Sequence, residues 1–265
     1  MPSPARWVGT EAGFAPYPCW STDDEPSSNG AGKPDGSAFI PAETDFTLQN
    51  SDNWFYSASA GVHPARELRL MWETSVGHNT PVIIDFAPFP NGSLPFEQKM
   101  ASVTLGKFIS GCYERALAAV TFFGAAGSAA SIDLNKTVAI DRVYLSEDMR
   151  ATRQQLVRGF TLMATLPNGT AVDLLPLGGI AAGSSIGAKF ILILATPLLV
   201  TKVTLGITTI ADGATGPPAI VFRLYSCAAL AAALDTEWDA FGFQPPPKSP
   251  AKGREVNALA LHRHR

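Results

Sequence analysis

Cysteine and histidine are scarce in this chain, which has only three cysteines and four histidines among 265 residues. Cys19, Cys112 and Cys227 lie far apart, a spacing that fits neither a metal site nor a dense disulfide framework. No group of His, Cys or carboxylate side chains has the spacing of metal ligands. We therefore expect no metal ion and no cofactor. Cys112 lies among the apolar residues of an expected helix, which predicts a buried free thiol.

Clustered positive charge is also lacking. Lys and Arg number 20 against 23 Asp and Glu, which gives a formal net charge of −3 at pH 7. The basic residues are scattered along the chain, whereas a protein that binds nucleic acid gathers Lys and Arg against the phosphates. We therefore expect no nucleic-acid partner.

Long hydrophobic runs are absent, although 46% of the residues are hydrophobic. The longest apolar runs, Ala116–Ala130 and Phe190–Val200, are shorter than the roughly 18 residues that a membrane span needs. The first is rich in small residues and indicates a helix end followed by a linker. The second contains Pro197 and indicates a buried strand. We therefore expect no membrane partner, and the sequence does not indicate an oligomeric state.

The start of the chain, Met1–Pro4, lacks the basic residues and the apolar run of a secretory signal peptide. Three N-glycosylation sequons nevertheless occur, beginning at Asn91, Asn135 and Asn168. A chain of this length often carries one or two sequons by chance. Three are therefore a mild indication of a secretory route.

Residues 1–116 alternate between helical and strand patterns. Pro64–Val76 has apolar residues at helical spacing, and Gly77 is placed to end this helix. Pro81–Phe86 is nearly all branched and apolar, which predicts a strand buried on both faces. Phe96–Arg115 predicts the next helix. This order is typical of β/α units in a parallel sheet or barrel, and a complete barrel needs about 250 residues.

Strands dominate the second part of the chain, in residues 133–228. Apolar runs flank Asn168-Gly169, and Asn-Gly between such runs is a strong hairpin signal. These patterns predict an antiparallel β-sandwich. We expect residues 117–132 to be a linker and residues 229–265 to be a disordered tail, because the tail carries Pro245–Pro250 and a basic end. The strands are expected at Thr137–Asp148, Phe160–Leu166, Ala171–Leu175, Phe190–Leu194, Val200–Ile207 and Ile220–Tyr225.

Four segments in residues 6–88 occur in an order that resembles the last third of the catalytic barrel of α-L-fucosidases, in glycoside hydrolase family 29. They are Arg6–Gly13 (RWVGTEAG), Ile40–Gln49 (IPAETDFTLQ), Asp52–Tyr56 (DNWFY) and Val76–Pro88 (VGHNTPVIIDFAP). The later strands are similar to the sandwich that comes after this barrel in many fucosidases. The resemblance covers roughly residues 6–225 and implies an incomplete (β/α)8 barrel followed by a galactose-binding-like β-sandwich.

Such enzymes release terminal L-fucose, so the resemblance implies a fucosylated oligosaccharide or glycoconjugate as substrate, and a secreted or lysosomal/vacuolar location. Retaining glycosidases use two carboxyl groups about 5–5.5 Å apart. In the family, the nucleophile is an Asp on an earlier barrel strand, and the segment around Arg6 already resembles the family's segment after that strand. We therefore expect the chain to lack the nucleophile and to be inactive by itself.

The resemblance also implies roles for particular residues. Glu11 matches the general acid/base Glu of one branch of the family, and Thr10 departs from the usual Asn before it. Glu43 resembles the acid/base position of the other branch, and we favour Glu11. Trp54 and Phe55 are expected to line the fucose pocket, because aromatic rings pack against the apolar edge of a sugar. Trp20 is expected at the rim of the same pocket.

Two other interpretations stay open. The chain could be a binding or structural module derived from a fucosidase, which keeps a partial barrel for binding sugar or another chain. It could also be a fragment of an ordinary enzyme. Upstream sequence encoding an Asp on a barrel strand would favour the fragment.

Overall fold

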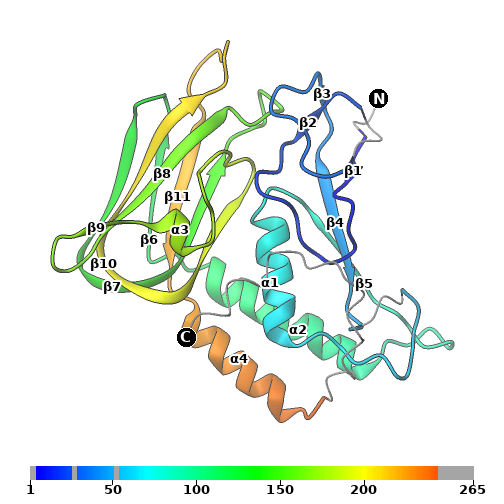
Figure 1. The fold of residues 1–265 in the computed structure, drawn as a ribbon. Helices are drawn as coiled ribbons and strands as arrows, with labels where there is room; N and C mark the ends of the chain where they lie inside the picture. The colour runs from blue at the N-terminus through cyan, green and yellow to red at the C-terminus, as the bar shows by residue number, and fades with distance from the viewer. Residues whose placement is uncertain (1–3, 26–28, 51–53, 244–265) are drawn as a thin grey trace.

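A computed structural model gives the fold of the chain and describes residues 4–25, 29–50 and 54–243. The described residues form two parts that pack side by side (Figure 1). One part is a short parallel sheet with helices, and the other is a large curved antiparallel sheet. Three further elements lie in loops of these parts: β2 (Thr22–Asp23), β3 (Ala38–Phe39) and α3 (Leu174–Leu177).

The first part is built on a three-stranded parallel sheet in the order β1-β4-β5. Its strands are β1 (Arg6–Trp7), β4 (Ala42–Thr47) and β5 (Val82–Asp85). Three helices pack with this sheet, namely α1 (Ala65–Val76), α2 (Phe96–Tyr113) and α4 (Ala228–Ala240). Phe46 of β4, Leu68 of α1, Leu105 of α2 and Trp238 of α4 share one core. The last helix of the described chain thus completes the packing of the first part.

Helix α1 confirms the helix predicted over residues 64–76. It begins directly after Pro64, whose fixed φ suits a helix start, and it ends at Val76 before Gly77. Leu68 and Met71 are buried on its inner side. The apolar spacing in the sequence therefore identified the helix and part of its buried surface, which also includes Arg69 and Glu73.

The face of the parallel sheet opposite the helices is open in the described part of the chain. Trp7 pairs with Glu43 and Asp45 pairs with Ile83, so these four residues point to the same face. Ile83 is 50% exposed. The prediction that the strand over residues 81–86 is buried on both faces was therefore wrong. Only the face that contacts the helices is covered, and apolar composition alone cannot reveal a missing layer.

The second part is a six-stranded sheet in the order β6-β11-β7-β10-β8-β9. Every neighbouring pair is antiparallel, as predicted. Asn168 and Gly169 lie in the turn between β8 and β9, which confirms the predicted hairpin. The strands are β6 (Ala118–Phe123), β7 (Ala129–Glu147), β8 (Val157–Thr165), β9 (Ala171–Asp173), β10 (Phe190–Ile210) and β11 (Ala219–Tyr225).

The two long strands β7 and β10 curve, so that the sheet bends around one core (Figure 1). The pairing of β7 with β10 shifts register between Ile193 and Leu198 and again between Val200 and Lys202. Such irregularities bend a strand and increase its twist. The two strands predicted at Phe190–Leu194 and Val200–Ile207 are therefore one bent strand. Side chains from β7, β8, β10 and β11 fill the core that it encloses.

The structure differs from the expected boundaries at both ends of the second part. The expected linker at 117–132 holds β6 and the start of β7. Residues of β6 alternate between partly buried and exposed. Strand β11 supplies the hydrogen-bonding partner for this segment. The expected tail at 229–265 begins with helix α4, whose Leu234 and Trp238 are buried. Residues 244–265, which include Pro245–Pro250 and the basic end, lie outside the described residues.

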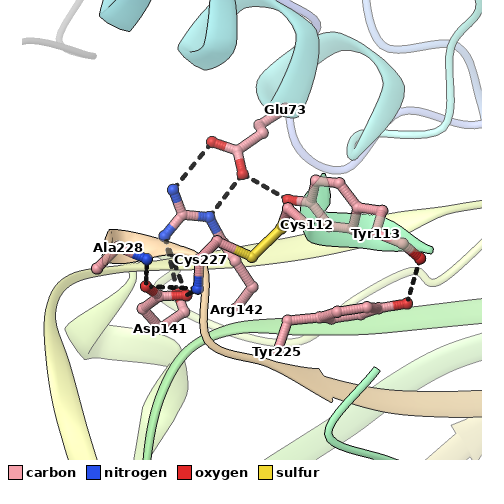
Figure 2. The surroundings of a disulfide bond; sticks show 8 residues. All are labelled: Glu73, Cys112, Tyr113, Asp141, Arg142, Tyr225, Cys227 and Ala228. Carbon is pink, nitrogen blue, oxygen red and sulfur yellow. Dashed lines mark hydrogen bonds and ion pairs between the residues drawn. A yellow bond between two sulfur atoms is a disulfide. The ribbon is translucent and has the colours of Figure 1, made fainter. Parts of the chain in front are cut away.

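A disulfide and a buried ion pair lie where the two parts meet (Figure 2). Cys112, near the end of α2, is bonded to Cys227, just before α4. The prediction of a free thiol at Cys112 was therefore wrong, because the fold brings together two cysteines that are 115 residues apart. Beside them, Glu73 of α1 accepts two hydrogen bonds from Arg142 of β7, of 2.6 and 3.1 Å. No helix in the described ranges is long and apolar enough to cross a membrane.

Candidate active site

Glu11 and Trp54 meet at the carboxyl-terminal edge of the parallel sheet. Glu11 lies in the loop that follows β1, and Trp54 lies in the loop that follows β4. The indole Nε1 of Trp54 donates a hydrogen bond of 2.9 Å to Oε2 of Glu11. Loops at the carboxyl ends of parallel strands meet at one edge, where β/α proteins bind their ligands. The structure thus brings together two of the residues that the sequence predicted for the site.

The loop that carries Glu11 is held at both ends. Before it, the Val8 N–H donates to the carbonyl of Glu43, and after it the Gly13 N–H donates to the carbonyl of Asp45. Gly13 has a φ of 72°, and a Cβ there would lie 2.8 Å from the ring of Phe46. Glycine therefore allows the loop to pack closely against β4. Glu11 lies in the exposed segment between the hydrogen bonds of Val8 and Gly13.

The loop that carries Trp54 is held by Gln49. The Gln49 amide donates to the carbonyl of Phe55 at 2.9 Å and accepts from the N–H of Ser57 at 2.9 Å. Phe55 is 86% exposed, whereas the ring of Tyr56 packs edge-on against Phe89. Gln49 was missed by the sequence analysis because its role is to shape a backbone turn. Its burial in the fold, which the sequence does not reveal, is what identifies it.

Glu43 lies within strand β4 and not in a loop. Its backbone pairs with Trp7 on the open face of the sheet. The neighbouring Trp7 Nε1 donates a hydrogen bond of 2.8 Å to Asp45 Oδ1. Glu43 therefore lies on the strand next to β1, which the Glu11 loop follows. It is about 13 Å from the carboxyl end of β4, at about 3.3 Å per residue.

Asp85 is a further acidic group at this edge that the sequence analysis did not select. It is the last residue of β5 and is paired with Thr47, the last residue of β4. Its Oδ2 atom is buried and has no hydrogen-bond partner within the described ranges. Desolvation raises the pKa of this carboxyl above its ordinary value. A carboxylate that ends an apolar strand is the sequence signal for such a group.

Trp20 and His78 are placed in packed surroundings. The Trp20 side chain is buried, and the guanidinium of Arg158 lies 4.7 Å from its ring centroid. Among the described side chains, no hydrogen bond or ring contact joins Trp20 to Glu11 or Trp54. His78 follows α1 and donates through Nδ1 to the carbonyl of Ala15, and burial lowers its pKa. The structure therefore shows a packing contact for Trp20, and its place at the rim of the sugar pocket stays a prediction.

A cavity of about 860 Å³ lies between the two parts of the molecule. Its lining includes Pro41 and Pro81, which directly precede β4 and β5. The cavity therefore lies toward the amino-terminal edge of the parallel sheet, away from Glu11. In β/α barrels this edge contributes to stability rather than to chemistry. No group of three or more His, Cys, Asp or Glu within the ranges described could hold a metal ion.

Comparisons with known proteins support the resemblance seen in the sequence. No protein-family model matches the chain. Alpha-L-fucosidase 1 of Arabidopsis thaliana is 34% identical over 96 residues, which are 33% of this chain and 19% of that protein. The matched region is thus about a fifth of the length of this curated relative.

Solved structures give the same result for the fold. A family 29 glycoside hydrolase from an unknown rumen bacterium matches with a TM-score of 0.73 and 24% identity. The match covers 84% of this chain and 40% of that structure. A family 29 fucosidase of Ruminococcus gnavus in complex with fucose matches with a TM-score of 0.71 and 18% identity, over 84% of this chain and 51% of that structure. The predicted resemblance is therefore confirmed: the chain is similar to part of an α-L-fucosidase, in sequence over a third of its length and in fold over most of it.

Proposed function

We propose that the chain is the carboxyl-terminal portion of a retaining α-L-fucosidase and that Glu11 is its general acid/base. The observation that carries this proposal is the hydrogen bond between Trp54 and Glu11 at the carboxyl edge of the parallel sheet. It places a carboxyl group beside an aromatic ring, and a glycosidase needs both around a terminal sugar. The substrate class is a glycan that ends in L-fucose, in keeping with the fucose complex of the structural relative.

Glu11 would protonate the leaving oxygen and then activate the water that releases fucose. A retaining enzyme uses the same residue for both steps, and a second carboxylate forms the covalent intermediate. We assign that nucleophile to an Asp on an earlier barrel strand that is not among these 265 residues, as the family resemblance implies. The 265-residue polypeptide would then be inactive until the remaining barrel strands are supplied. The open face of the sheet, with Trp7 and Ile83 exposed, supports this view because parallel sheets are usually covered on both faces.

The choice of Glu11 over Glu43 rests on position. Glu11 is on an exposed loop beyond the end of β1, whereas Glu43 is in the body of β4. Catalytic groups of β/α barrels gather in the loops after the strands. Trp54 fixes the Glu11 carboxyl through its indole N–H, and the exposed ring of Phe55 would extend the apolar wall of the sugar pocket.

The test is a restored enzyme in which the preceding barrel strands of a close relative are fused ahead of residue 6. Glu11→Ala should slow fucosides with poor leaving groups far more than activated aryl fucosides, because an activated leaving group needs little protonation. Azide should restore turnover of the activated substrate, since a small anion attacks the fucosyl-enzyme without base assistance. Glu43→Ala is the matched control. If azide rescue and leaving-group dependence follow Glu43 instead, the assignment to Glu11 is overturned.

A non-catalytic carbohydrate-binding module is the second candidate function, and the exposure of Phe55 beside Trp54 favours it. The same restored protein distinguishes a binding module from an enzyme. A binding module would retain affinity for fucose and show no turnover with either Glu present. An enzyme would turn over, and Glu11→Gln would abolish turnover of fucosides with poor leaving groups while leaving fucose binding measurable.

A further inference from the structure

Asn91 begins a sequon in the exposed turn between β5 and α2. Ser93 donates both its N–H, at 3.0 Å, and its hydroxyl, at 2.8 Å, to Oδ1 of Asn91. The turn is closed by hydrogen bonds between Phe89 and Ser93 and between Gly92 and Phe89. Asn91, Gly92 and Ser93 are all exposed. Both residues that define the sequon are therefore accessible, and the asparagine amide nitrogen makes no hydrogen bond to the described residues.

Asn168 begins a second sequon, at the tip of the hairpin between β8 and β9. Oδ1 of Asn168 accepts a hydrogen bond of 3.0 Å from the Thr170 N–H. Leu166 pairs with Thr170 across the turn, and Gly169 supplies the left-handed conformation that the turn requires, with φ of 85°. Asn168, Gly169 and Thr170 are exposed. This site has the same arrangement as Asn91, with an exposed tip and an amide oxygen turned back toward the Ser or Thr.

Asn135 begins the third sequon, but its setting is different. It lies inside strand β7, at the register shift against β10, with φ of 54°. Its own N–H donates to Asp133, and within the described ranges no hydrogen bond joins its side chain to Thr137. The third site is thus a strand irregularity rather than a loop tip, and we do not assign it a glycan.

The disulfide indicates the compartment in which such sites are used. Cys112 and Cys227 are bonded, and both residues are buried. Disulfides form and persist in oxidising compartments and are rare in the cytosol, where thiols are kept reduced. The eukaryotic secretory pathway is oxidising and is also where asparagine receives oligosaccharide. The disulfide and the exposed sequons are independent observations that agree on one compartment.

We propose that Asn91 and Asn168 are acceptor sites for N-linked oligosaccharide. In the transfer, the side-chain amide nitrogen forms a bond to C1 of the first sugar of a polyprenyl-diphosphate oligosaccharide. The bond from C1 to the diphosphate oxygen breaks, the diphosphate leaves, and the amide gives up one proton. No oxidant or reductant is needed.

The two glycans would lie on different parts of the molecule. Asn168 is in the hairpin between β8 and β9, at one edge of the antiparallel sheet. Asn91 follows Phe89 by two residues, and the Phe89 ring contacts Tyr56 of the loop that holds Trp54, with centroids 4.5 Å apart. A glycan at Asn91 would therefore stand beside the candidate active site, while a glycan at Asn168 would not.

The test uses the full 265-residue chain directed into the secretory pathway of a eukaryotic host by a foreign signal peptide. The secreted protein is analysed by intact mass and peptide mapping before and after an amidase that removes N-linked glycans and leaves Asp at each modified position. Asn91→Gln and Asn168→Gln remove one acceptor each. Thr170→Ser keeps the second sequon and Thr170→Ala destroys it, and these two variants change the same exposed position. Asn29→Gln, at an exposed asparagine outside any sequon, is the control for the substitution itself.

We expect the amidase to lower the mass of the secreted chain, with Asp found at positions 91 and 168. Asn91→Gln, Asn168→Gln and Thr170→Ala should each lose one glycan, whereas Thr170→Ser and Asn29→Gln should lose none. An unchanged mass after amidase treatment would overturn the proposal. So would amidase-generated Asp at position 135 alone, or loss of a glycan in Thr170→Ser.

Discussion

Glu147 shows how a single buried carboxyl group can make stability depend on pH. It ends β7, and its side chain accepts hydrogen bonds from the backbone N–H groups of Leu156, Val157 and Gly187. Burial raises its pKa from 4.5 to about 7, and the three N–H donors oppose this shift only in part. The folded protein therefore holds a proton on Glu147 at pH values where the unfolded chain has lost it.

The direction of the pH effect follows from that difference in proton binding. The stabilising contribution is fully present below pH 4.5 and is lost as the pH rises through about 7. The loss amounts to about 3 kcal/mol of unfolding free energy. Glu147→Gln should be less stable than the parent at about pH 5, because both carboxyl oxygens accept backbone N–H bonds and the amide NH2 of Gln cannot accept. Because Gln cannot ionise, the variant should also show a shallower decline toward about pH 8. Urea unfolding at both pH values measures this. An equally steep decline in Glu147→Gln would assign the pH effect to other groups.

The buried pair of Glu73 and Arg142 joins the two parts of the molecule. Two charge-assisted hydrogen bonds connect the side chains, and the hydroxyl of Tyr113 donates to the same Glu73 carboxylate. Burial and the adjacent carboxylate raise the pKa of Tyr113 well above its ordinary value, so this hydroxyl keeps its proton. Among the described residues, Arg142 is therefore the cation that compensates a carboxylate with 2% side-chain exposure.

Removing one partner of this pair should lower the unfolding free energy more than removing both. Arg142→Met leaves an uncompensated buried carboxylate, which should lower the unfolding free energy by about 3–5 kcal/mol. The double variant Arg142→Met with Glu73→Leu should recover part of that loss, because no buried charge remains at this pair. Denaturant titration measures both. Lys107→Met, which breaks the exposed pair with Glu237, is the control and should change stability by less than about 1 kcal/mol.

At the scale of elements, helix α4 depends on contacts with both parts. Asp141 of β7 accepts hydrogen bonds from the N–H groups of Cys227 and Ala228, at the helix start. Further along, Asp235 makes a bidentate ion pair with Arg69 of α1, at 2.9 and 2.7 Å. The disulfide fixes the residue before α4 to the end of α2 (Figure 2). The position of helix α4 against the first part therefore depends on the antiparallel sheet as well.

The disulfide should contribute strongly to stability because it closes a long loop. Its two cysteines are 115 residues apart, and a loop of about 100 residues gives about 4.7 kcal/mol in the chain-entropy model. We expect reduction, or the paired change Cys112→Ser with Cys227→Ser, to lower the midpoint of denaturant unfolding. Cys19→Ser is the control, since this free cysteine takes no part in the bond. A parent protein whose midpoint does not respond to reductant would contradict the assignment.

Local patterns predicted the elements well where the cause was local. The helix after Pro64 and the Asn168-Gly169 hairpin both depend on residues that are neighbours in sequence. The disulfide could not be predicted, because two cysteines 115 residues apart give no local signal of proximity. Helix α4 was missed although Ala favours a helix, because the prediction for residues 229–265 rested on Pro245–Pro250 and the basic end that follow the helix.

The candidate site shows the same division. The Arg6–Gly13 motif led to Glu11, and the aromatic motif led to Trp54, which the fold places in contact. Gln49 and Asp85 were missed because their roles arise from burial at strand ends, which is a tertiary property. The contact between Trp20 and Arg158 could not be predicted either, because Arg158 is 138 residues later in the chain.

At the scale of the whole molecule, the two parts should differ in their ability to fold alone. The antiparallel sheet has its own core, formed by β7, β8, β10 and β11 with α3. The first part needs Trp238 from α4 to complete its core, and its described residues leave one sheet face open. We therefore expect residues 117–228 to unfold cooperatively as an isolated piece. Residues 4–116 should aggregate or stay loosely packed, because they expose apolar surface and strand edges.

Thermal unfolding followed by circular dichroism, together with size-exclusion chromatography, measures this difference. Residues 130–228 are a useful comparison, because that piece lacks β6 and uncovers one edge of β11. It should melt at a lower temperature than residues 117–228. A monomeric, cooperatively folding piece of residues 4–116 would show that the first part does not depend on α4.

Catalytic activity is the property that depends most on the whole molecule. We expect the purified 265-residue chain to show no turnover of an aryl fucoside, because a retaining mechanism needs two cooperating carboxyl groups and we assign the nucleophile elsewhere. Losing one member of such a pair removes most of the rate. Glu11→Gln is the matched control, since a fucosidase carried over from the expression host would be equally active in both preparations. Turnover in the parent that Glu11→Gln abolishes would refute the prediction. It would place the nucleophile within this chain, and Asp85, whose buried Oδ2 lacks a hydrogen-bond partner among the described residues at the same edge of the sheet, would then be the first residue to replace.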